Sequence, residues 1–171
     1  LSKSHSNNDY KISIVMGSDS DLVNMKPAID IIEEFGIEKD ICILSAHRTP
    51  LEMMEYAKNA EINKIKVIIA GAGGSAHLPG MVASLTNLPV IGVPIESKVL
   101  KGIDSLLSIV QMPGGIPVAT VAINGSKNAG LLAIQIISLF DDAIKIKLQI
   151  FRDKQSESVR LKNNNLNQIG V

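Results

Sequence analysis

The sequence is poor in aromatic residues. Phenylalanine, tyrosine and tryptophan make up 3% of its 171 residues, and tryptophan is absent. Flavin sites often stack the ring of the cofactor on tryptophan or tyrosine. The composition therefore argues against a non-catalytic flavin- or nucleotide-binding module, although such a module remains an alternative on an α/β fold. Isoleucine, valine, leucine and alanine are left to form the core.

Residues that form disulfides or bind metals are also scarce. Cys42 is the only cysteine, so an intrachain disulfide or a thiolate metal cluster is excluded. It lies in the apolar run Ile41–Leu44, where we expect a buried strand and an inert thiol. The three histidines, His5, His47 and His77, have no ligand-like spacing to carboxylates. We therefore predict no metal site.

Charge of one sign is not in excess, since 17 Lys and Arg balance 17 Asp and Glu. We therefore expect no nucleic-acid partner and no anionic membrane surface. No apolar run approaches the ~20 residues that cross a bilayer, and residues 1–9 lack the apolar core of a signal peptide. These features predict a cytoplasmic protein. The 46% hydrophobic content and mean hydropathy of +0.23 exceed what one small domain buries, which suggests a homo-oligomer.

Strand-like and helix-like segments alternate along most of the chain. The expected strands are residues 11–16, 40–44, 66–70, 90–93 and 117–123, and the expected helices are residues 21–35, 51–62, 78–85, 103–110 and 128–148. The strands are nearly continuous apolar runs, which is typical of strands covered on both faces. Repeated βα units then predict an α/β fold with a five-stranded parallel sheet in three layers.

The sequence is expected to consist of one domain between two polar ends. We expect a polar N-terminal extension over residues 1–10 and a single domain over residues 11–154, which ends in an amphipathic helix over residues 141–154. Residues 155–171 are rich in Asn, Ser, Gln and Lys, which favours a loose polar tail.

The run Ser45–Pro50 carries a hydroxyl, an imidazole and a guanidinium at the end of a predicted strand. In open α/β sheets ligands bind at the carboxyl ends of the strands. Thr49 and Pro50 are typical of a helix start, which accounts for them without any function. Arg48 can hold a phosphate with two hydrogen bonds, and the imidazole of His47 can carry a proton in both directions. A lone histidine here is more often structural, but beside Ser45 and Arg48 it favours function.

The run Gly17–Asp21 closes the first strand and opens the first helix. It could cap the helix, which Ser and Asp commonly do. It could also bind a phosphate through N–H groups and the Ser18 hydroxyl, while the Asp21 carboxylate accepts from sugar hydroxyls. The sequence leaves both interpretations open.

Two further loops are rich in small residues. Gly71–Gly80 follows the third strand and allows the backbone to approach a ligand closely, or to wall off a tight pocket around Gly73 and Leu78. Its spacing is not that of a dinucleotide loop. His77 could be a second proton carrier or could bond loop carbonyls, and we favour the supporting role. Gln111–Pro117 could be a rigid turn, a lid or a pocket wall.

These four loops, in this order and spacing, resemble the PurE family of purine biosynthesis over roughly residues 11–150. One class of the family moves a carboxylate within N5-carboxyaminoimidazole ribonucleotide; the other carboxylates aminoimidazole ribonucleotide with CO₂. The second class typically has Ser-Ala-His-Lys-Gly-Pro at the first site and an Asn-bearing glycine loop. Arg48-Thr49 and Ala76–Pro79 are similar to the first class, the mutase. The turn Asn124–Asn128 is shorter than in many relatives but lies beyond the residues assigned to chemistry.

The resemblance implies a flavodoxin-like fold, a homo-octamer with active sites between subunits, and a C-terminal helix that packs across neighbours. It implies no metal, ATP or organic cofactor. By residue type and position, it implies that Ser18, Asp21 and Arg48 bind the ribonucleotide and that His47 is the general acid/base. We add Ser45 as a phosphate ligand. We also add Gly73, His77 and Leu78 as walls of a pocket for CO₂.

Overall fold

The computed structural model describes residues 10–168. All of the predicted N-terminal extension except Tyr10, together with residues 169–171, lies outside this range. The described chain forms two compact units, up to Ala133 and from Ile134 onward, so the division falls within one helix.

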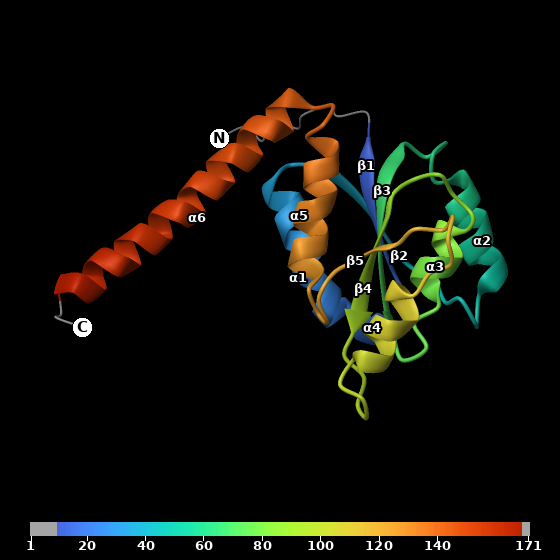
Figure 1. Ribbon diagram of the computed structural model, residues 1–171. Coiled ribbons are helices and arrows are strands. Elements are labelled where there is room, and N and C mark those ends of the chain that lie inside the picture. The colour runs from blue at the N-terminus through green and yellow to red at the C-terminus, as the bar shows by residue number, and fades with distance from the viewer. Residues whose placement is uncertain (1–9, 169–171) are drawn as a thin grey trace. The chain divides into compact units, whose positions relative to one another are not determined.

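The first unit is built on a five-stranded sheet whose pairs are all parallel (Figure 1). The strands are β1 (Lys11–Met16), β2 (Glu38–Ile43), β3 (Ile65–Gly73), β4 (Val90–Ile95) and β5 (Ala119–Thr120), in the spatial order β2-β1-β3-β4-β5. This order is that of flavodoxin-like folds, and it brings the carboxyl ends of β1 and β3 side by side. The predicted fold class is confirmed.

Helices cover both faces of this sheet. In chain order the helices are the 3₁₀ turn η1 (Asp19–Asp21), α1 (Leu22–Glu34), α2 (Pro50–Asn59), α3 (Leu78–Ala83), α4 (Ile103–Val110), α5 (Ser126–Ile137) and α6 (Asp142–Gln168). Helix α1 lies on one face, and α2, α3 and α4 lie on the other (Figure 1). The start of α5 packs tightly on α1, because a Cβ on Gly130 would lie 2.5 Å from Ile31 Cγ2.

The core is formed by the central strands. Strands β1, β3 and β4 are buried along almost their whole length, as their continuous apolar runs predict. The prediction of a buried second strand was wrong for most of β2. It is an edge strand, and Ile41 and Ile43 remain 42% and 56% exposed. Cys42 is half-buried, and burial raises the pKa of its thiol, with a smaller contribution from Asp40.

Strand β5 is shorter than predicted. It pairs with β4 only at Ile91↔Ala119 and Gly92↔Thr120. Pro94 has no N–H to offer to a longer ladder, although its carbonyl oxygen still accepts from Asn124 N at 2.8 Å.

The second unit corrects two expectations at the C-terminus. The predicted helix over residues 128–148 is interrupted after Ile137, and Asp141 Oδ1 then accepts from Ile144 N at 3.0 Å, which caps a new helix. That helix, α6, continues through Gln168, where the composition predicted a loose tail. Its sequence lacks Gly and Pro, and the pair Gln149–Asp153 supports it at the i, i+4 spacing.

Candidate active site

A cavity of about 490 Å³ lies where β1, β2, β3 and β4 end. It is lined by residues that immediately follow these strands, so one edge of the sheet assembles it. All eight residues proposed from the sequence line this one cavity: Ser18, Asp21, Ser45, His47, Arg48, Gly73, His77 and Leu78.

The loop after β1 both caps a helix and faces the cavity. Ser18 is the N-cap of η1, and its Oγ accepts from Ser20 N at 3.4 Å and from Ser20 Oγ at 3.0 Å. Asp21 makes no side-chain cap for α1. Burial raises the pKa of the Asp21 carboxyl above its ordinary value, while hydrogen bonds with Ser18 and Ser20 oppose the shift. Ser18 therefore caps a helix while it lines the cavity, and Asp21 lines the cavity without capping a helix.

The loop after β2 is braced around Ser45. Its Oγ accepts from Arg48 N at 3.1 Å and from Arg48 Nε at 3.3 Å. Arg48 Nη2 also donates to Gly17 O at 2.9 Å, which ties this loop to the end of β1. The exposed guanidinium is therefore held in a fixed orientation beside the cavity, and a planar donor fixed in this way suits an oxyanion.

Thr49 and Pro50 start α2 as predicted, with Pro50 in the first turn. The Thr49 hydroxyl does not cap α2. It bonds backwards instead, accepting from Ser45 N at 3.0 Å and donating to Ser45 O at 3.3 Å. This closes the turn that presents His47 and Arg48.

Two histidines meet across the cavity. His47 Nε2 and His77 Nδ1 lie 2.7 Å apart, and the rings meet edge to face with centroids 4.9 Å apart. In such a contact one nitrogen carries the proton and the other accepts it. Both side chains are exposed to the cavity. The pair therefore gives the site a proton that can be held on either ring.

The loop after β3 forms a wall of small residues. Gly73 ends β3, and the chain then turns through Gly74 and Ala76, with φ of 67° and 36°, into α3. Leu78 follows, 2% exposed, with its side chain in the core. The result is a boundary of small residues on the same side as His77.

Known proteins that are similar to this chain identify its family. A sequence model described as AIR carboxylase matches residues 11–158.

The chain belongs to the AIR carboxylase family.

Its curated relatives include an N5-carboxyaminoimidazole ribonucleotide mutase of Thermotoga maritima, 59% identical over 160 residues, or 94% of each chain. A phosphoribosylaminoimidazole carboxylase of Schizosaccharomyces pombe is 53% identical over 159 residues, which are 93% of this chain but 29% of that protein. A solved structure, Treponema denticola PurE, is 31% identical with a TM-score of 0.84, covering 91% of this chain and 98% of that one. The predicted resemblance to PurE is confirmed.

One wall of the cavity was not predicted from the sequence. Glu96, Ser97 and Lys98 follow β4 and line the same cavity. They lie after a parallel strand, as the predicted site residues do, so the same rule could have found them.

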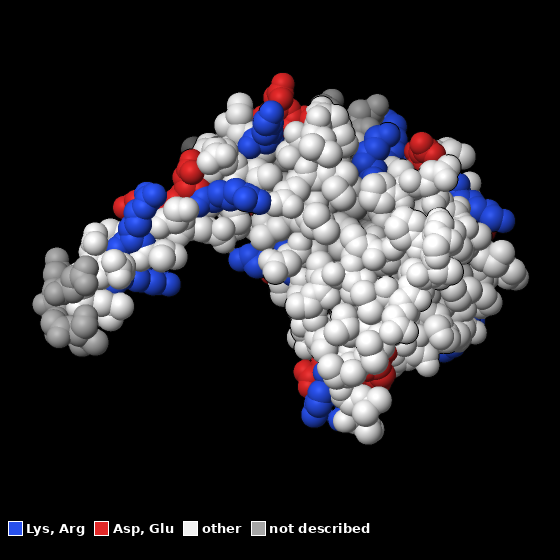
Figure 2. All heavy atoms as spheres, viewed as in Figure 1, with Lys and Arg blue, Asp and Glu red and all other residues white. Residues whose placement is uncertain are grey.

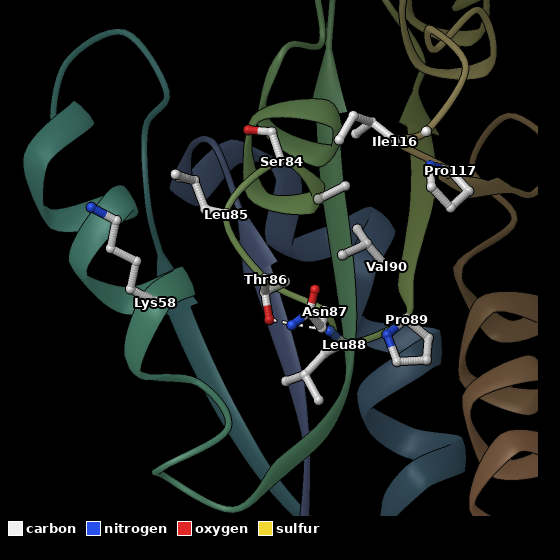
Figure 3. A pocket seen from close by; sticks show the side chains of 12 residues that line it. Lys58, Ser84, Leu85, Thr86, Asn87, Leu88, Pro89, Val90, Ile116 and Pro117 are labelled. Carbon is white, nitrogen blue, oxygen red and sulfur yellow. Dashed lines mark hydrogen bonds between the residues drawn. The ribbon is translucent and has the colours of Figure 1, made fainter.

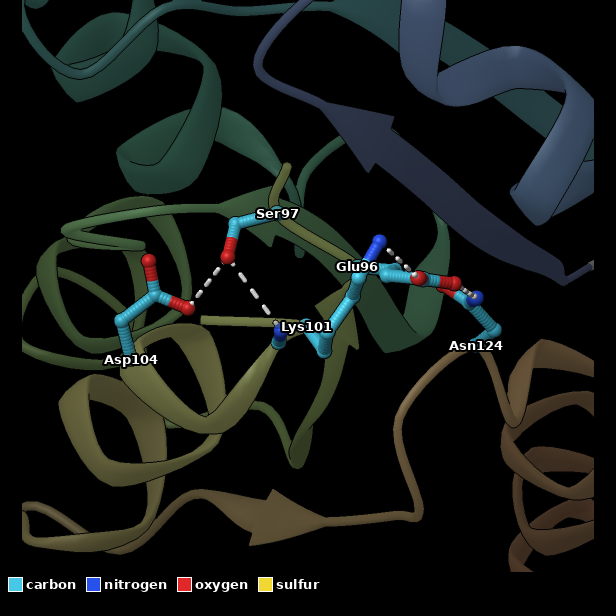
Figure 4. A network of polar contacts seen from close by, with 6 residues as sticks. Glu96, Ser97, Lys101, Asp104 and Asn124 are labelled. Atoms are coloured by element: carbon cyan, nitrogen blue, oxygen red, sulfur yellow. Dashed lines mark hydrogen bonds and ion pairs between the residues drawn. The ribbon is translucent and has the colours of Figure 1, made fainter. Parts of the chain in front are cut away.

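A polar network holds this wall in place (Figure 4). Ser97 Oγ donates to Asp104 Oδ1 at 2.7 Å, and Glu96 accepts from Asn124 Nδ2 at 3.3 Å. Asn124 Oδ1 accepts in turn from Glu96 N at 3.0 Å. The turn that begins at Asn124 therefore braces the cavity wall, although the sequence placed it beyond the chemistry.

The loop Gln111–Pro117 does not reach this cavity. Gly115, Ile116 and Pro117 line a separate cavity of about 760 Å³, together with Lys58 and the segment 83–90 (Figure 3). This cavity lies where β4 and β5 begin, at the opposite edge of the sheet. The loop also contacts α3, since a Cβ on Gly80 would lie 2.6 Å from Met112 Sδ. It is thus a pocket wall, but not of the cavity around His47.

Two kinds of feature are absent from the part of the chain that the structure describes. Within residues 10–168, no group of three or more His, Cys, Asp and Glu side chains is arranged to hold a metal ion. No helix in that range combines the length and the apolarity that a membrane crossing requires.

Proposed function

We propose that this protein is an N5-carboxyaminoimidazole ribonucleotide mutase of purine biosynthesis. It would move the carboxylate from N5 to C4, giving 4-carboxy-5-aminoimidazole ribonucleotide. The observation that carries the proposal is the convergence of a histidine pair, a braced arginine and an acidic side chain in one cavity. The names of its relatives support the same reaction.

The cavity offers a distinct group for each part of such a ribonucleotide. Arg48, braced by Ser45, and the Ser18 hydroxyl face the phosphate. The carboxylate of Asp21 accepts from the ribose hydroxyls. This arrangement brings the imidazole ring of the substrate toward His47 and His77, which lie together at 2.7 Å.

One histidine is sufficient for the proton transfers. The bond between N5 and the carboxylate carbon breaks and releases CO₂, and His47 donates a proton to the nitrogen. C4 of the electron-rich imidazole then attacks the same CO₂. His47 takes up the proton that remains on C4, so no net proton is gained or lost. The contact with His77 at 2.7 Å supports the ring of His47 during this cycle.

The intermediate CO₂ has almost no group by which a protein can bind it. It must be retained by enclosure, and the wall of Gly73 and Leu78 beside His77 supplies a close, largely apolar boundary. Enclosure also excludes water from the intermediates.

We further propose that the protein is cytoplasmic, that each chain carries one catalytic domain, and that the chains assemble into the homo-octamer that the resemblance implies. Large apolar side chains are exposed along α4 and the loop before it: Val99, Leu100, Ile103, Leu107 and Val110. In Figure 2 charged side chains of both signs gather at the lower end of the first unit, where the loop before α4 lies, while the surface above them carries few. Such a surface is typical of an interface. Light scattering would detect a mass about eight times the 18.3 kDa of one chain.

The decisive experiment is a direct assay with N5-carboxyaminoimidazole ribonucleotide, without ATP or added bicarbonate. The wild-type protein should form the C4 product. His47→Asn should bind the ribonucleotide but turn over roughly 10²-fold or more slowly, as expected when a general acid/base is lost. Near-wild-type turnover in that variant would contradict the mechanism.

A second candidate is the CO₂-dependent carboxylation of aminoimidazole ribonucleotide. The carboxylase name of the fission-yeast relative favours it. Turnover of aminoimidazole ribonucleotide that saturates at low bicarbonate would support this candidate. Turnover that needs very high bicarbonate would support the mutase.

A further inference from the structure

Ser105 is a fully buried polar side chain on α4 that lies directly behind the cavity wall. Its exposed fraction is 0%. Its Oγ donates to Ile95 O at 2.7 Å and accepts from Gly74 N at 2.9 Å. Ile95 and Gly74 both line the cavity. One hydroxyl therefore joins the end of β4 to the loop after β3.

The hydrogen bond between Gly74 and Ser105 lies just beyond the end of the pairing between β3 and β4. The ladder between β3 and β4 ends at the pair Gly73↔Ile95. The next residue, Gly74, turns away with a φ of 67°, so its N–H cannot continue a strand. Ser105 accepts from this N–H, and Ala76 N donates to Gly73 O at 3.2 Å to close the turn. The serine thus fixes a turn that the sheet leaves unsupported.

The turn leads directly to the histidine pair. His77 follows Ala76 and lies 2.7 Å from His47. A displacement of Gly74 would therefore move the wall beside the reacting atoms and the ring of His77 together. Ser108 would hardly replace the bond between Ser105 and Gly74. Its Oγ lies 3.5 Å from Gly74 O and donates instead to Asp104 O at 2.7 Å.

We propose that Ser105 is a positioning residue that keeps the turn from Gly73 to His77 closed over CO₂ between its release from N5 and its capture by C4. This inference rests on the proposed mutase function. Without the hydroxyl, the turn loosens and CO₂ escapes before C4 attacks. The released product is then aminoimidazole ribonucleotide, formed from the substrate by loss of CO₂ and gain of one proton.

The test compares Ser105→Ala with Ser13→Ala. Ser13 is also 0% exposed, and it lies near the start of β1, away from the edge of the sheet that carries the cavity. Both variants lose a buried hydroxyl, so both should lose thermal stability. N5-carboxyaminoimidazole ribonucleotide is supplied without bicarbonate, and the two products are quantified after the spontaneous decay of the substrate is subtracted.

In Ser105→Ala we expect kcat to fall roughly 10- to 100-fold, the range for a displacement of about 1 Å at a reacting centre. KM should change less than about 3-fold, because the contacts of Arg48 and Asp21 are untouched. The share of turnovers that end as aminoimidazole ribonucleotide should rise severalfold, and added CO₂ should lower it again. Ser13→Ala should keep the wild-type ratio of products.

A Ser105→Ala variant that is less stable but keeps the wild-type turnover and product ratio would overturn the inference. If this variant does not fold, Ser105→Cys places a weaker hydrogen-bonding group of similar size at the same position. It should also release more aminoimidazole ribonucleotide, and a wild-type ratio would overturn the inference equally. Failure of the wild-type chain to form the C4 product would instead refute the mutase function itself.

Discussion

Removal of the Tyr56 hydroxyl should destabilise the fold, because it leaves the buried hydroxyl of Ser13 without its acceptor. Tyr56 on α2 donates to Asp40 Oδ2 at 2.5 Å, and its oxygen lies 2.6 Å from Ser13 Oγ. The phenol has one proton, which goes to the carboxylate, so Ser13 must be the donor in the second bond. These bonds tie α2, which begins just after Arg48, to β2 and β1.

The two partners respond differently to Tyr56→Phe. Asp40 is half-buried and can recover water, whereas Ser13 is fully buried and loses its acceptor. A buried polar group left without a partner costs about 1–3 kcal/mol. At roughly 2–4 °C per kcal/mol for a chain of this size, Tm should fall by about 2–12 °C.

Unfolding in urea at a fixed protein concentration measures this cost, together with the Ser13→Ala and double variants. The double variant removes donor and acceptor together, so its loss should be smaller than the sum of the single losses by about 0.5–3 kcal/mol. Additive losses, or a Tyr56→Phe variant within about 0.5 kcal/mol of wild type, would refute the reasoning.

The raised pKa of the Tyr56 hydroxyl predicts that the folded protein loses stability at alkaline pH. Burial, and then the hydrogen bond to Asp40, raise the pKa of Tyr56 above its ordinary value of 10.0. The folded state therefore holds this proton more tightly than the unfolded state. The resulting stability is fully present below pH 10 and is lost as the pH rises beyond it. The wild-type protein should lose stability above about pH 10 more steeply than Tyr56→Phe.

Two further substitutions test the site. Arg48→Ala should weaken ribonucleotide binding by roughly 10- to 100-fold, the value of a lost charged hydrogen bond, and an unchanged Kd by calorimetry would exclude a phosphate role. Gly74→Ala should cost about 1–2 kcal/mol from its φ of 67° alone, since a Cβ there meets no atom within 4 Å. Gly114→Ala, where a Cβ is equally unhindered and φ is not positive, is the matched control and should be nearly neutral in urea unfolding.

The sequence predicted most of the site because parallel strands end at one edge of a sheet. Ser18, His47 and His77 are far apart in the chain, yet each lies in a loop that follows a strand, so their meeting is a consequence of topology. Glu96–Lys98 obeys the same rule, but it resembles an ordinary loop of charged residues and carries no motif. Gln111–Pro117 precedes a strand, which places it at the opposite edge.

Other features could not be predicted from local patterns. Ile41 and Ile43 read as buried because apolar residues usually are, and only the strand order makes β2 an edge. The role of Asn124 depends on a contact with Glu96, 28 positions away. Residues 155–168 have the composition of a disordered segment, but their helix continues one that Asp141 starts upstream. For β2 and Asn124 tertiary structure decides what composition leaves open, and for residues 155–168 the upstream part of the helix does.

The exposed edge of β2 should affect the solubility of newly synthesised chains. Charged residues at Glu38–Asp40 discourage strand addition along its first half, whereas Ile41 and Ile43 leave the second half apolar. The other edge, β5, is only two residues long and offers little template. Newly synthesised chains should therefore aggregate through the end of β2. Soluble yield should rise with a charged residue at position 41 or with slower expression, unless assembly covers this edge first.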